Sequence, residues 1–237
     1  MSKESVMLQV NFQNLPKLSF RVNEAYKSLR TNIQFCGSGV KMICITSCLP
    51  NEGKSNVSFN LATSLAECGK KVIFIDADLR RSVIIGRYKP DQAVVGLTHY
   101  LSGQNKIDEI LYETNIDNLD IIFTGPVPPN PSELLASDNF SDLIKIFRKV
   151  YDYIIIDTPP IGSVIDSAIV AQKCDGVVLV IESNTVSYKF AQRAIRQLEK
   201  SQSKILGAVL NKYENEGRLY GYESKKSKKY IDYYLEN

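Results

Sequence analysis

A lysine and a serine that could handle phosphate follow a short apolar run. Residues 42–45 are apolar, residues 47–55 form a loop-like stretch that ends in Lys54 and Ser55, and a helical pattern comes next. Strand, loop and helix in this order are typical of a P-loop. Backbone N–H groups of such a loop point at phosphates, the lysine reaches the β- and γ-phosphates, and the hydroxyl ligates Mg²⁺. The match is incomplete, because Cys48 replaces the first glycine of the G-x-x-x-x-G-K-[ST] pattern.

Carboxylates end two further apolar runs. Residues 71–75 lead into Asp76 and Asp78, and residues 153–156 lead into Asp157. Such runs are typical of parallel strands buried on both faces, whose carboxyl ends are where ligands bind. The i, i+2 spacing puts Asp76 and Asp78 on one side of an extended chain, and Asp157 matches a Walker B acid that holds Mg²⁺ through water. The alternative is that these acids only cap the turns that follow.

Taken together, the loop and the three acids predict a nucleoside triphosphatase of the P-loop class. Such sites position the transferred phosphoryl group and neutralise its charge. The acceptor is water in an ATPase and a hydroxyl in a kinase. Residues 212–237 favour a kinase, because they hold six of the 13 tyrosines without any core pattern. A phenol has a pKa of about 10, so a carboxylate near the γ-phosphate would help as a base, and Asp76 is the candidate. The alternative is a tail that docks on a partner through its aromatic rings.

The elements that must position these groups form a mostly parallel α/β sheet flanked by helices. Strands are expected at about residues 40–46, 71–76, 119–123, 153–157, 176–181 and 204–211. Helices are expected at about residues 23–35, 55–67, 96–101, 107–112, 132–135, 140–150, 166–174 and 187–200. We expect an N-terminal arm at 1–20, the P-loop domain at 21–211 and a flexible tyrosine-rich tail at 212–237. Asn211 ends the last strand, where its amide could bind an adenine edge or stabilise a turn.

The bulk composition narrows the remaining classes of function. A chain of 237 residues with 44% hydrophobic residues can fill the core of one α/β domain. The net charge of +3 is spread out, so no nucleic-acid partner is expected. Five cysteines without a C-x-x-C pair, together with the lack of an apolar leader, predict a cytoplasmic chain with reduced thiols. The single histidine, His99, excludes a His–His metal site within the chain.

Several longer stretches carry a resemblance to a known family. They are residues 45–55, residues 74–81 (Phe-Ile-Asp-Ala-Asp-Leu-Arg-Arg), residues 125–135, residues 153–160 and the tyrosine cluster. Over essentially its whole length the chain resembles the bacterial tyrosine kinases (BY-kinases) of capsule and exopolysaccharide synthesis, in their cytoplasmic single-chain form. The spacing of Glu24, Lys27 and Arg30 resembles the motif through which these kinases assemble into rings; without the resemblance, these charges would be a solvated helix face.

The resemblance implies a role for each matching residue. ATP and Mg²⁺ would be the cofactors, with Lys54, Asp76 and Asp78 as catalytic residues. The expected nucleotide contacts are Asn51, Glu52, Gly53, Lys54, Ser55 and Asn56 in and next to the loop, together with Asn211, which is expected from its position at the end of the last strand. The expected magnesium ligands are Ser55, Asp78 and, behind a water, Asp157. The expected phosphorylation sites, modified in trans by neighbouring subunits, are Tyr220, Tyr222, Tyr230, Tyr233 and Tyr234. A membrane-bound polysaccharide co-polymerase would activate the enzyme and recruit it to the inner face of the cell membrane.

Four positions depart from the family pattern. Asn51 replaces a usual glycine, and Asn tolerates the left-handed backbone that glycine would supply. Asn56 replaces a common threonine, Ser82 a usual proline and Lys27 a usual arginine, whose bidentate fork is lost. The main alternative is a partitioning or cell-division type P-loop ATPase switch; those proteins usually carry a lysine at the position of Cys48 and an amphipathic C-terminal helix, and this sequence has neither. A third possibility is a regulator that binds ATP without catalysis.

Overall fold

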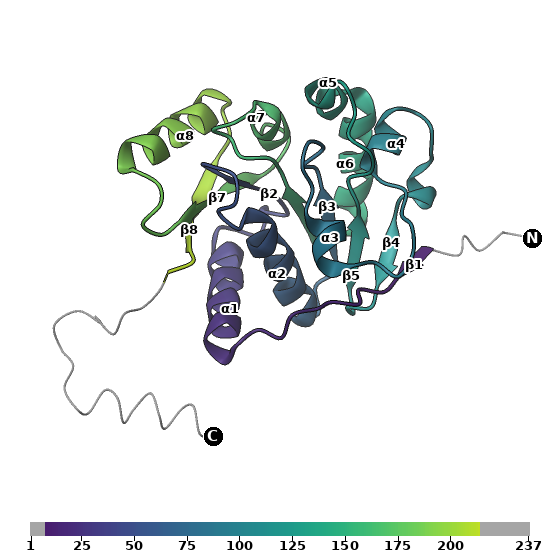
Figure 1. Ribbon diagram of the computed structural model, residues 1–237, viewed down its shortest axis with the longest axis horizontal. Coiled ribbons are helices and arrows are strands. Elements are labelled where there is room, and N and C mark those ends of the chain that lie inside the picture. The colour runs from purple at the N-terminus through teal and green to yellow at the C-terminus, as the bar shows by residue number, and fades with distance from the viewer. Residues whose placement is uncertain (1–7, 214–237) are drawn as a thin grey trace, which may run out of the picture.

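Eight strands form one sheet in the computed structural model, which describes residues 8–213 (Figure 1). Their order across the sheet is β1-β4-β5-β3-β6-β2-β7-β8, and every neighbouring pair is parallel except β4 and β5. The strands are β1 (Leu8–Val10), β2 (Met42–Ser47), β3 (Val72–Asp76), β4 (Tyr112–Thr114), β5 (Leu119–Ile122), β6 (Tyr153–Asp157), β7 (Gly176–Glu182) and β8 (Ile205–Asn211).

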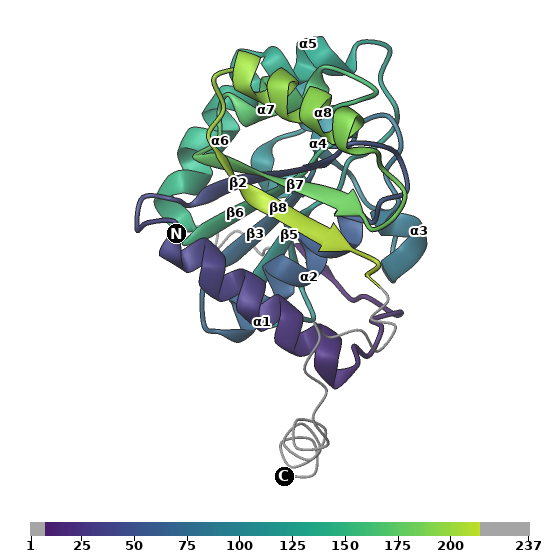
Figure 2. The same cartoon turned by 90° about the vertical axis from the view of Figure 1, so that its left-hand side faces the viewer.

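Helices cover both faces of this sheet (Figures 1 and 2). On one face lie α1 (Phe20–Phe35), α2 (Lys54–Glu67) and α3 (Ile84–Tyr88). On the other lie α4 (Leu97–Leu101), α5 (Pro131–Ala136), α6 (Asp138–Val150), α7 (Asp166–Ala171) and α8 (Tyr188–Lys200). A 3₁₀ turn, η1 (Ile107–Glu109), precedes β4. Within residues 8–213, no helix combines the length and the apolar character needed to cross a membrane.

The central strands are mostly apolar because each contributes side chains to two cores. In β2, Met42 and Cys44 pack under α5–α8, while Ile43 and Ile45 pack under α1–α3. This is the pattern expected for a parallel strand with both faces covered. In the register of β3 against β6, Asp76 lies directly opposite Asp157. The pairing therefore brings the acids of two distant segments to one edge of the sheet, as predicted.

The fold class is confirmed, but some elements were not predicted correctly. The N-terminal arm contributes β1, which pairs with β4 and buries Val10. Residues 107–112 were expected to be helical; only Ile107–Glu109 forms a 3₁₀ turn, and β4 begins at Tyr112. Helix α3 was not predicted. These elements are three to five residues long, too short for a periodic pattern, and tertiary pairing decides their structure.

The buried face of α1 is centred on Ile33. Leu29 and Tyr26 are partly buried against the same core, whereas Ala25 and Asn32 are exposed. Asn60 Nδ2 on α2 donates a hydrogen bond to the Tyr26 hydroxyl at 3.3 Å. Helix α1 therefore contacts the core through these three side chains.

Phe12 is expected to anchor the N-terminal segment. Its ring is 4% exposed and lies 5.4 Å from the ring of Phe59 and 5.7 Å from that of Tyr88. Phe12→Ala should lower the free energy of unfolding by about 3–5 kcal/mol, because a buried aromatic leaves a cavity. Urea unfolding of the full chain measures this. Phe20→Ala, at a ring that is 58% exposed, should change stability by less than about 0.5 kcal/mol; equal losses would contradict the anchoring role.

Candidate nucleotide-binding site

The loop between β2 and α2 has the backbone shape that its sequence predicts. Asn51 has φ 69° and Gly53 has φ 86°, both in the left-handed region. The expectation that Asn51 substitutes for glycine in this conformation is confirmed. The N–H groups of Asn56 and Val57 donate to the carbonyl oxygen of Gly53 at 3.0 Å, which starts α2 directly after the loop. The positive end of a 14-residue helix therefore faces the loop.

Glu52 holds the loop from behind rather than presenting its carboxylate to a ligand. The side chain is buried. Its Oε2 accepts from the N–H of Leu49 at 2.5 Å, and its Oε1 accepts from the N–H of Glu182 at 3.0 Å. Any contribution of Glu52 to nucleotide binding would therefore come from its backbone.

The end of β8 braces the same loop. Asn211 Nδ2 donates to the Glu52 carbonyl oxygen at 2.8 Å, so the structure uses this amide to hold the loop. Lys212 Nζ donates to the Asn51 carbonyl oxygen at 2.8 Å and pairs with Glu182 at 3.0 Å. Because Lys212 also lines the cavity described below, this segment both shapes the loop and adds a cation to the site.

Lys54 lies among the three side chains that were predicted to bind magnesium. Its Nζ is 2.9 Å from Asp78 Oδ2, 3.4 Å from Asp157 Oδ2 and 3.2 Å from Ser55 Oγ. Burial acts to lower the pKa of Lys54, but the nearby carboxylates of Asp157 and Asp78 raise it overall. Burial raises the pKa of Asp157, and the charge of Lys54 opposes that shift. The lysine therefore neutralises the buried acids.

The donor set fits a magnesium ion. Asp157 Oδ1 is buried without a hydrogen-bond partner. The Ser55 hydroxyl and the Asp78 carboxylate both contact the Lys54 ammonium group. Among residues 8–213 there is no group of three or more His, Cys, Asp or Glu side chains that could hold a metal. Mg²⁺ usually takes one or two carboxylates and completes its octahedron with phosphate oxygens and water, which matches two acids and one hydroxyl beside a phosphate-binding loop.

Asp76 lies deeper than Asp78 does. Its side chain is fully buried, and burial raises its pKa to about 8. Its Oδ1 accepts from the N–H of Asp78 at 3.4 Å, and its Oδ2 accepts a hydrogen bond from Ser82 Oγ. A phenol would therefore have to displace the Ser82 hydroxyl or exchange its proton through it to use Asp76 as a base.

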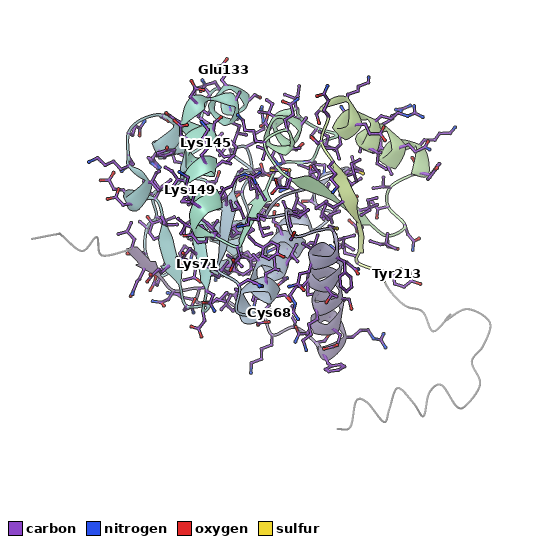
Figure 3. All side chains as sticks on the ribbon, turned by 180° about the vertical axis from the view of Figure 1, so that it is seen from behind. Cys68, Lys71, Glu133, Lys145, Lys149 and Tyr213 are labelled. Atoms are coloured by element: carbon purple, nitrogen blue, oxygen red, sulfur yellow. The ribbon has the colours of Figure 1, made fainter. Side chains whose placement is uncertain are left out.

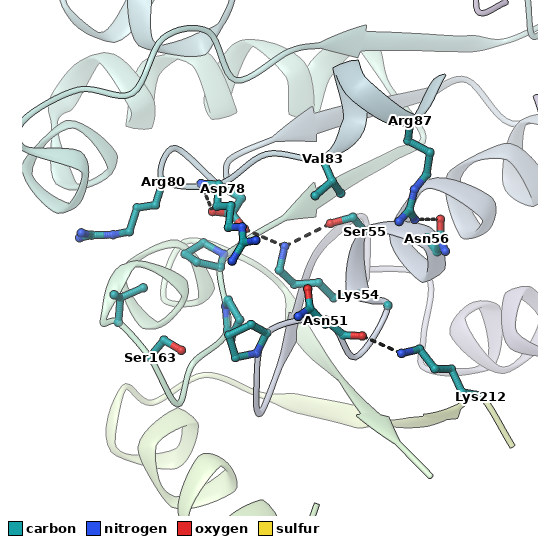
Figure 4. A pocket seen from close by; sticks show the side chains of 16 residues that line it. Asn51, Lys54, Ser55, Asn56, Asp78, Arg80, Val83, Arg87, Ser163 and Lys212 are labelled. Carbon is teal, nitrogen blue, oxygen red and sulfur yellow. Dashed lines mark hydrogen bonds and ion pairs between the residues drawn. The ribbon is translucent and has the colours of Figure 1, made fainter. Parts of the chain in front are cut away.

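Lys54, Ser55 and Asp78 border a cavity of about 360 Å³ whose lining holds several cationic side chains (Figure 4). The cationic residues that line it are Lys54, Arg80, Arg81, Arg87 and Lys212. The predicted residues that line it are Asn51, Gly53, Lys54, Ser55, Asn56 and Asp78. Such a concentration of positive charge favours the binding of a polyanion, such as the phosphate chain of a nucleotide. Arg87 and Lys212 were not predicted from the sequence, and the only signal for either was the position of Lys212 directly after Asn211.

Arg80 links the loop after β3 to helices α5 and α7. Its Nε and Nη2 donate to the two oxygens of the buried Asp166 at 2.8 and 3.0 Å. Ser132 Oγ, at the start of α5, donates to the same carboxylate at 2.7 Å. The segment 125–135, singled out from its sequence, is thereby tied to the loop that carries Asp78.

The remaining predicted residues lie away from the cavity or outside the described part of the chain. Glu24 and Lys27 form an exposed ion pair at 2.7 Å on α1. Arg30 Nη1 instead donates to the carbonyl oxygen of Ser64 on α2 at 2.7 Å. The five tyrosines predicted to be phosphorylated lie outside the described residues, which end at the exposed Tyr213 (Figure 3).

Gly53→Ala is expected to weaken nucleotide binding by about tenfold or more, which is about 1.4 kcal/mol. A Cβ at Gly53 would lie 2.2 Å from Asn211 Nδ2, so Asn211 would have to release the loop. Gly69→Ala is the matched control, because Gly69 also has positive φ but a Cβ there meets nothing within 4 Å. Titration with Mg²⁺ and ADP measures both. Equal affinities for the two variants would contradict the bracing role of Asn211.

The fold and the site together define a P-loop nucleoside triphosphatase. Residues 40–212 match the AAA domain family. The chain is 45% identical over 201 residues to the tyrosine-protein kinase CpsD of Streptococcus agalactiae, covering 85% of this chain and 88% of CpsD. The kinase domain of the Escherichia coli tyrosine kinase ETK is similar in structure, with a TM-score of 0.79 and 33% identity over 89% of this chain and 86% of ETK's. The chain belongs to the bacterial tyrosine-protein kinase family, as the sequence motifs predicted.

The partitioning and cell-division ATPases are more distant. The septum site-determining protein MinD of Pyrococcus horikoshii, complexed with Mg-ADP, matches with a TM-score of 0.61 and 26% identity, covering 77% of this chain and 74% of MinD. The alternative function is therefore the weaker one. MinD nevertheless shows that a related fold binds a nucleotide together with magnesium.

Proposed function

We propose that this chain transfers the γ-phosphoryl group of ATP to tyrosines in the C-terminal tail of a neighbouring copy. Membership of the tyrosine-protein kinase family makes this reaction the first expectation. The observation that carries it is the contact of Lys54 with Ser55, Asp78 and Asp157 at the edge of a cationic cavity. That set offers a phosphate-binding cation and a magnesium ligand group at one point.

In this reaction the residues of the site would have different roles. The loop from Asn51 to Ser55 binds the phosphates through its backbone, and Lys54 moves from the acids to the β- and γ-phosphates. Ser55 and Asp78 would hold a magnesium ion, with Asp157 nearby, and that ion would help to neutralise charge on the transferred group. Asp76 takes the proton of the incoming phenol. Asn56 contributes to the nucleotide contacts from the first turn of α2.

The acceptors that we propose are the tail tyrosines Tyr220, Tyr222, Tyr230, Tyr233 and Tyr234, phosphorylated in trans. Glu24, Lys27 and Arg30 on α1 would form the contact between copies in a ring. Since Arg30 bonds Ser64 of its own chain, the exposed pair Glu24 and Lys27 is the part of this motif directed outward. A cytoplasmic chain recruited to the membrane by a polysaccharide co-polymerase would then regulate capsule or exopolysaccharide synthesis and export.

Mass spectrometry of the tail after incubation with Mg²⁺ and ATP tests the proposal. The purified full chain is incubated with and without the cytoplasmic segment of the membrane-bound polysaccharide co-polymerase. We expect phosphate on the tail tyrosines and more of it when the segment is present. Steady ATP hydrolysis with an unphosphorylated tail in both samples would favour the partitioning-type ATPase instead.

A further inference from the structure

Arg87 lines the cavity, but it has no part in the proposed transfer of phosphate. It belongs to α3, the first of the two five-residue helices between β3 and β4. Its guanidinium Nη1 donates to Asn56 Oδ1, in the first turn of α2 (Figure 4). Asn56 directly follows Lys54 and Ser55 and lines the same cavity. The contact therefore brings a fixed positive charge to the end of α2 that faces the phosphates.

The backbone of Arg87 is held in place independently of its side chain. Its carbonyl oxygen accepts from Asn14 Nδ2 at 2.9 Å, and the carbonyl oxygen of Tyr88 accepts from the Asn14 N–H at 3.3 Å. The ring of Tyr88 stacks on that of Phe59 on α2, with centroids 4.0 Å apart. The backbone of Arg87 is thus held by the N-terminal segment and its guanidinium by Asn56 on α2, so little conformational entropy remains to be lost when a ligand binds.

The guanidinium group of Arg87 has further hydrogen-bond donors that could bind a ligand. A guanidinium has five N–H donors in a planar fork, and Asn56 occupies one of them. Arginine matches phosphate oxygens two at a time, which a lysine ammonium does not. On the opposite wall of the cavity, Lys212 is held by Asn51 (Figure 4). A phosphate chain lying along α2 would thus have a cation on each side.

We propose that Arg87 is a phosphate-binding residue of the nucleotide site, held in position by Asn56. Its ligand is the phosphate chain of a nucleoside di- or triphosphate. The inference rests on the nucleotide-binding part of the proposed function and not on the transfer to tyrosine. It also makes the N-terminal segment around Asn14 a support of the site, because that segment holds the carbonyl groups of α3.

Direct titration of the full chain with ADP and Mg²⁺ tests this role. Arg87→Ala should weaken ADP binding roughly tenfold to a hundredfold, the usual loss for a hydrogen bond to a charged group. Arg87→Lys keeps the positive charge but loses the planar guanidinium, so its affinity for ADP should lie between those of the wild type and Arg87→Ala. Arg196→Ala is the matched control, because Arg196 is exposed on α8 and is not among the residues that line the cavity; the ADP affinity of this variant should equal that of the wild type.

A double-mutant cycle with Asn56→Ala separates binding from simple tethering of α3. If Asn56 positions Arg87, then Asn56→Ala should weaken binding in the wild type and have less effect in the Arg87→Ala background. Thermal unfolding of the same variants without nucleotide reports any purely structural loss. An Arg87→Ala chain with lowered thermal stability and unchanged ADP affinity would overturn the proposal, because α3 would then only be tethered.

The two proposals fail in different ways. A wild-type chain that binds ADP but forms no phosphotyrosine would contradict the kinase function, and the affinity of Arg87→Ala would still decide the role of Arg87. A wild-type chain that phosphorylates its tail while Arg87→Ala binds ADP equally well would overturn the inference alone. A wild-type chain without affinity for ADP would overturn both.

Discussion

A Lys54→Met chain is expected to form no phosphotyrosine when it is incubated with Mg²⁺ and ATP in the absence of any other kinase. Lys54 is the cation at the centre of the site, 2.9 Å from Asp78 and 3.4 Å from Asp157. Methionine has a similar length but cannot bind phosphate or neutralise the two acids. Positioning and charge neutralisation are most of what a phosphoryl-transfer site does. Mass spectrometry of the tail measures the loss, and normal phosphorylation of Lys54→Met would show that the kinase proposal is wrong.

Mixing experiments guard against loss of activity through misfolding, because removing one partner of a buried ion pair costs about 3–5 kcal/mol. Wild-type chain added to a mass-distinguishable Lys54→Met chain should phosphorylate the tail of the variant, which shows transfer between copies. Lys145→Met is the matched control. Lys145 makes an ion pair of the same length with Asp142, at an exposed position on α6 (Figure 3), and its loss should leave phosphorylation unchanged.

The carboxyl edge of the sheet was predictable because its signals are local. Strands β3 and β6 are apolar runs that end directly in Asp76 and Asp157. Parallel strands covered by helices on both faces align such ends by themselves. The left-handed conformation at Asn51 was also predictable, since it depends on one residue and its neighbours in the chain.

The walls of the site were not predictable, because they come from distant segments without periodic patterns. Arg87 reaches the site only because Tyr88 stacks on Phe59 and because α3 is fixed to the N-terminal segment. It was not predicted from the sequence that the side chains of Glu52 and Asn211, both expected to contact the nucleotide, also brace the loop. Side-chain direction in a loop depends on which backbone N–H and C=O groups need partners, and that follows only from the assembled fold.

Asp76→Asn is expected to lower the rate of tyrosine phosphorylation by about a hundredfold or more, the usual contribution of a general base. The affinity for ADP and Mg²⁺ should stay within about twofold, because Asp76 lies behind Asp78 and away from the cavity lining. Asparagine has the same shape and keeps an acceptor for the N–H of Asp78. The initial rate of tail phosphorylation and the ADP titration, measured on one preparation, separate catalysis from binding.

Asp120→Asn is the matched control for Asp76→Asn. Asp120 is also a buried acid on a strand, burial also raises its pKa, and Tyr151 donates a hydrogen bond to it at 2.6 Å. It lies near the start of β5 rather than at the carboxyl edge of the sheet, so its replacement should not slow phosphorylation. A chain that only regulates a partner by binding ATP would phosphorylate no faster with Asp76 than with Asn. Equal rates for the wild type and Asp76→Asn would therefore contradict the assigned base and favour such a regulator, whereas a loss confined to Asp76→Asn requires that this carboxylate take part in the transfer.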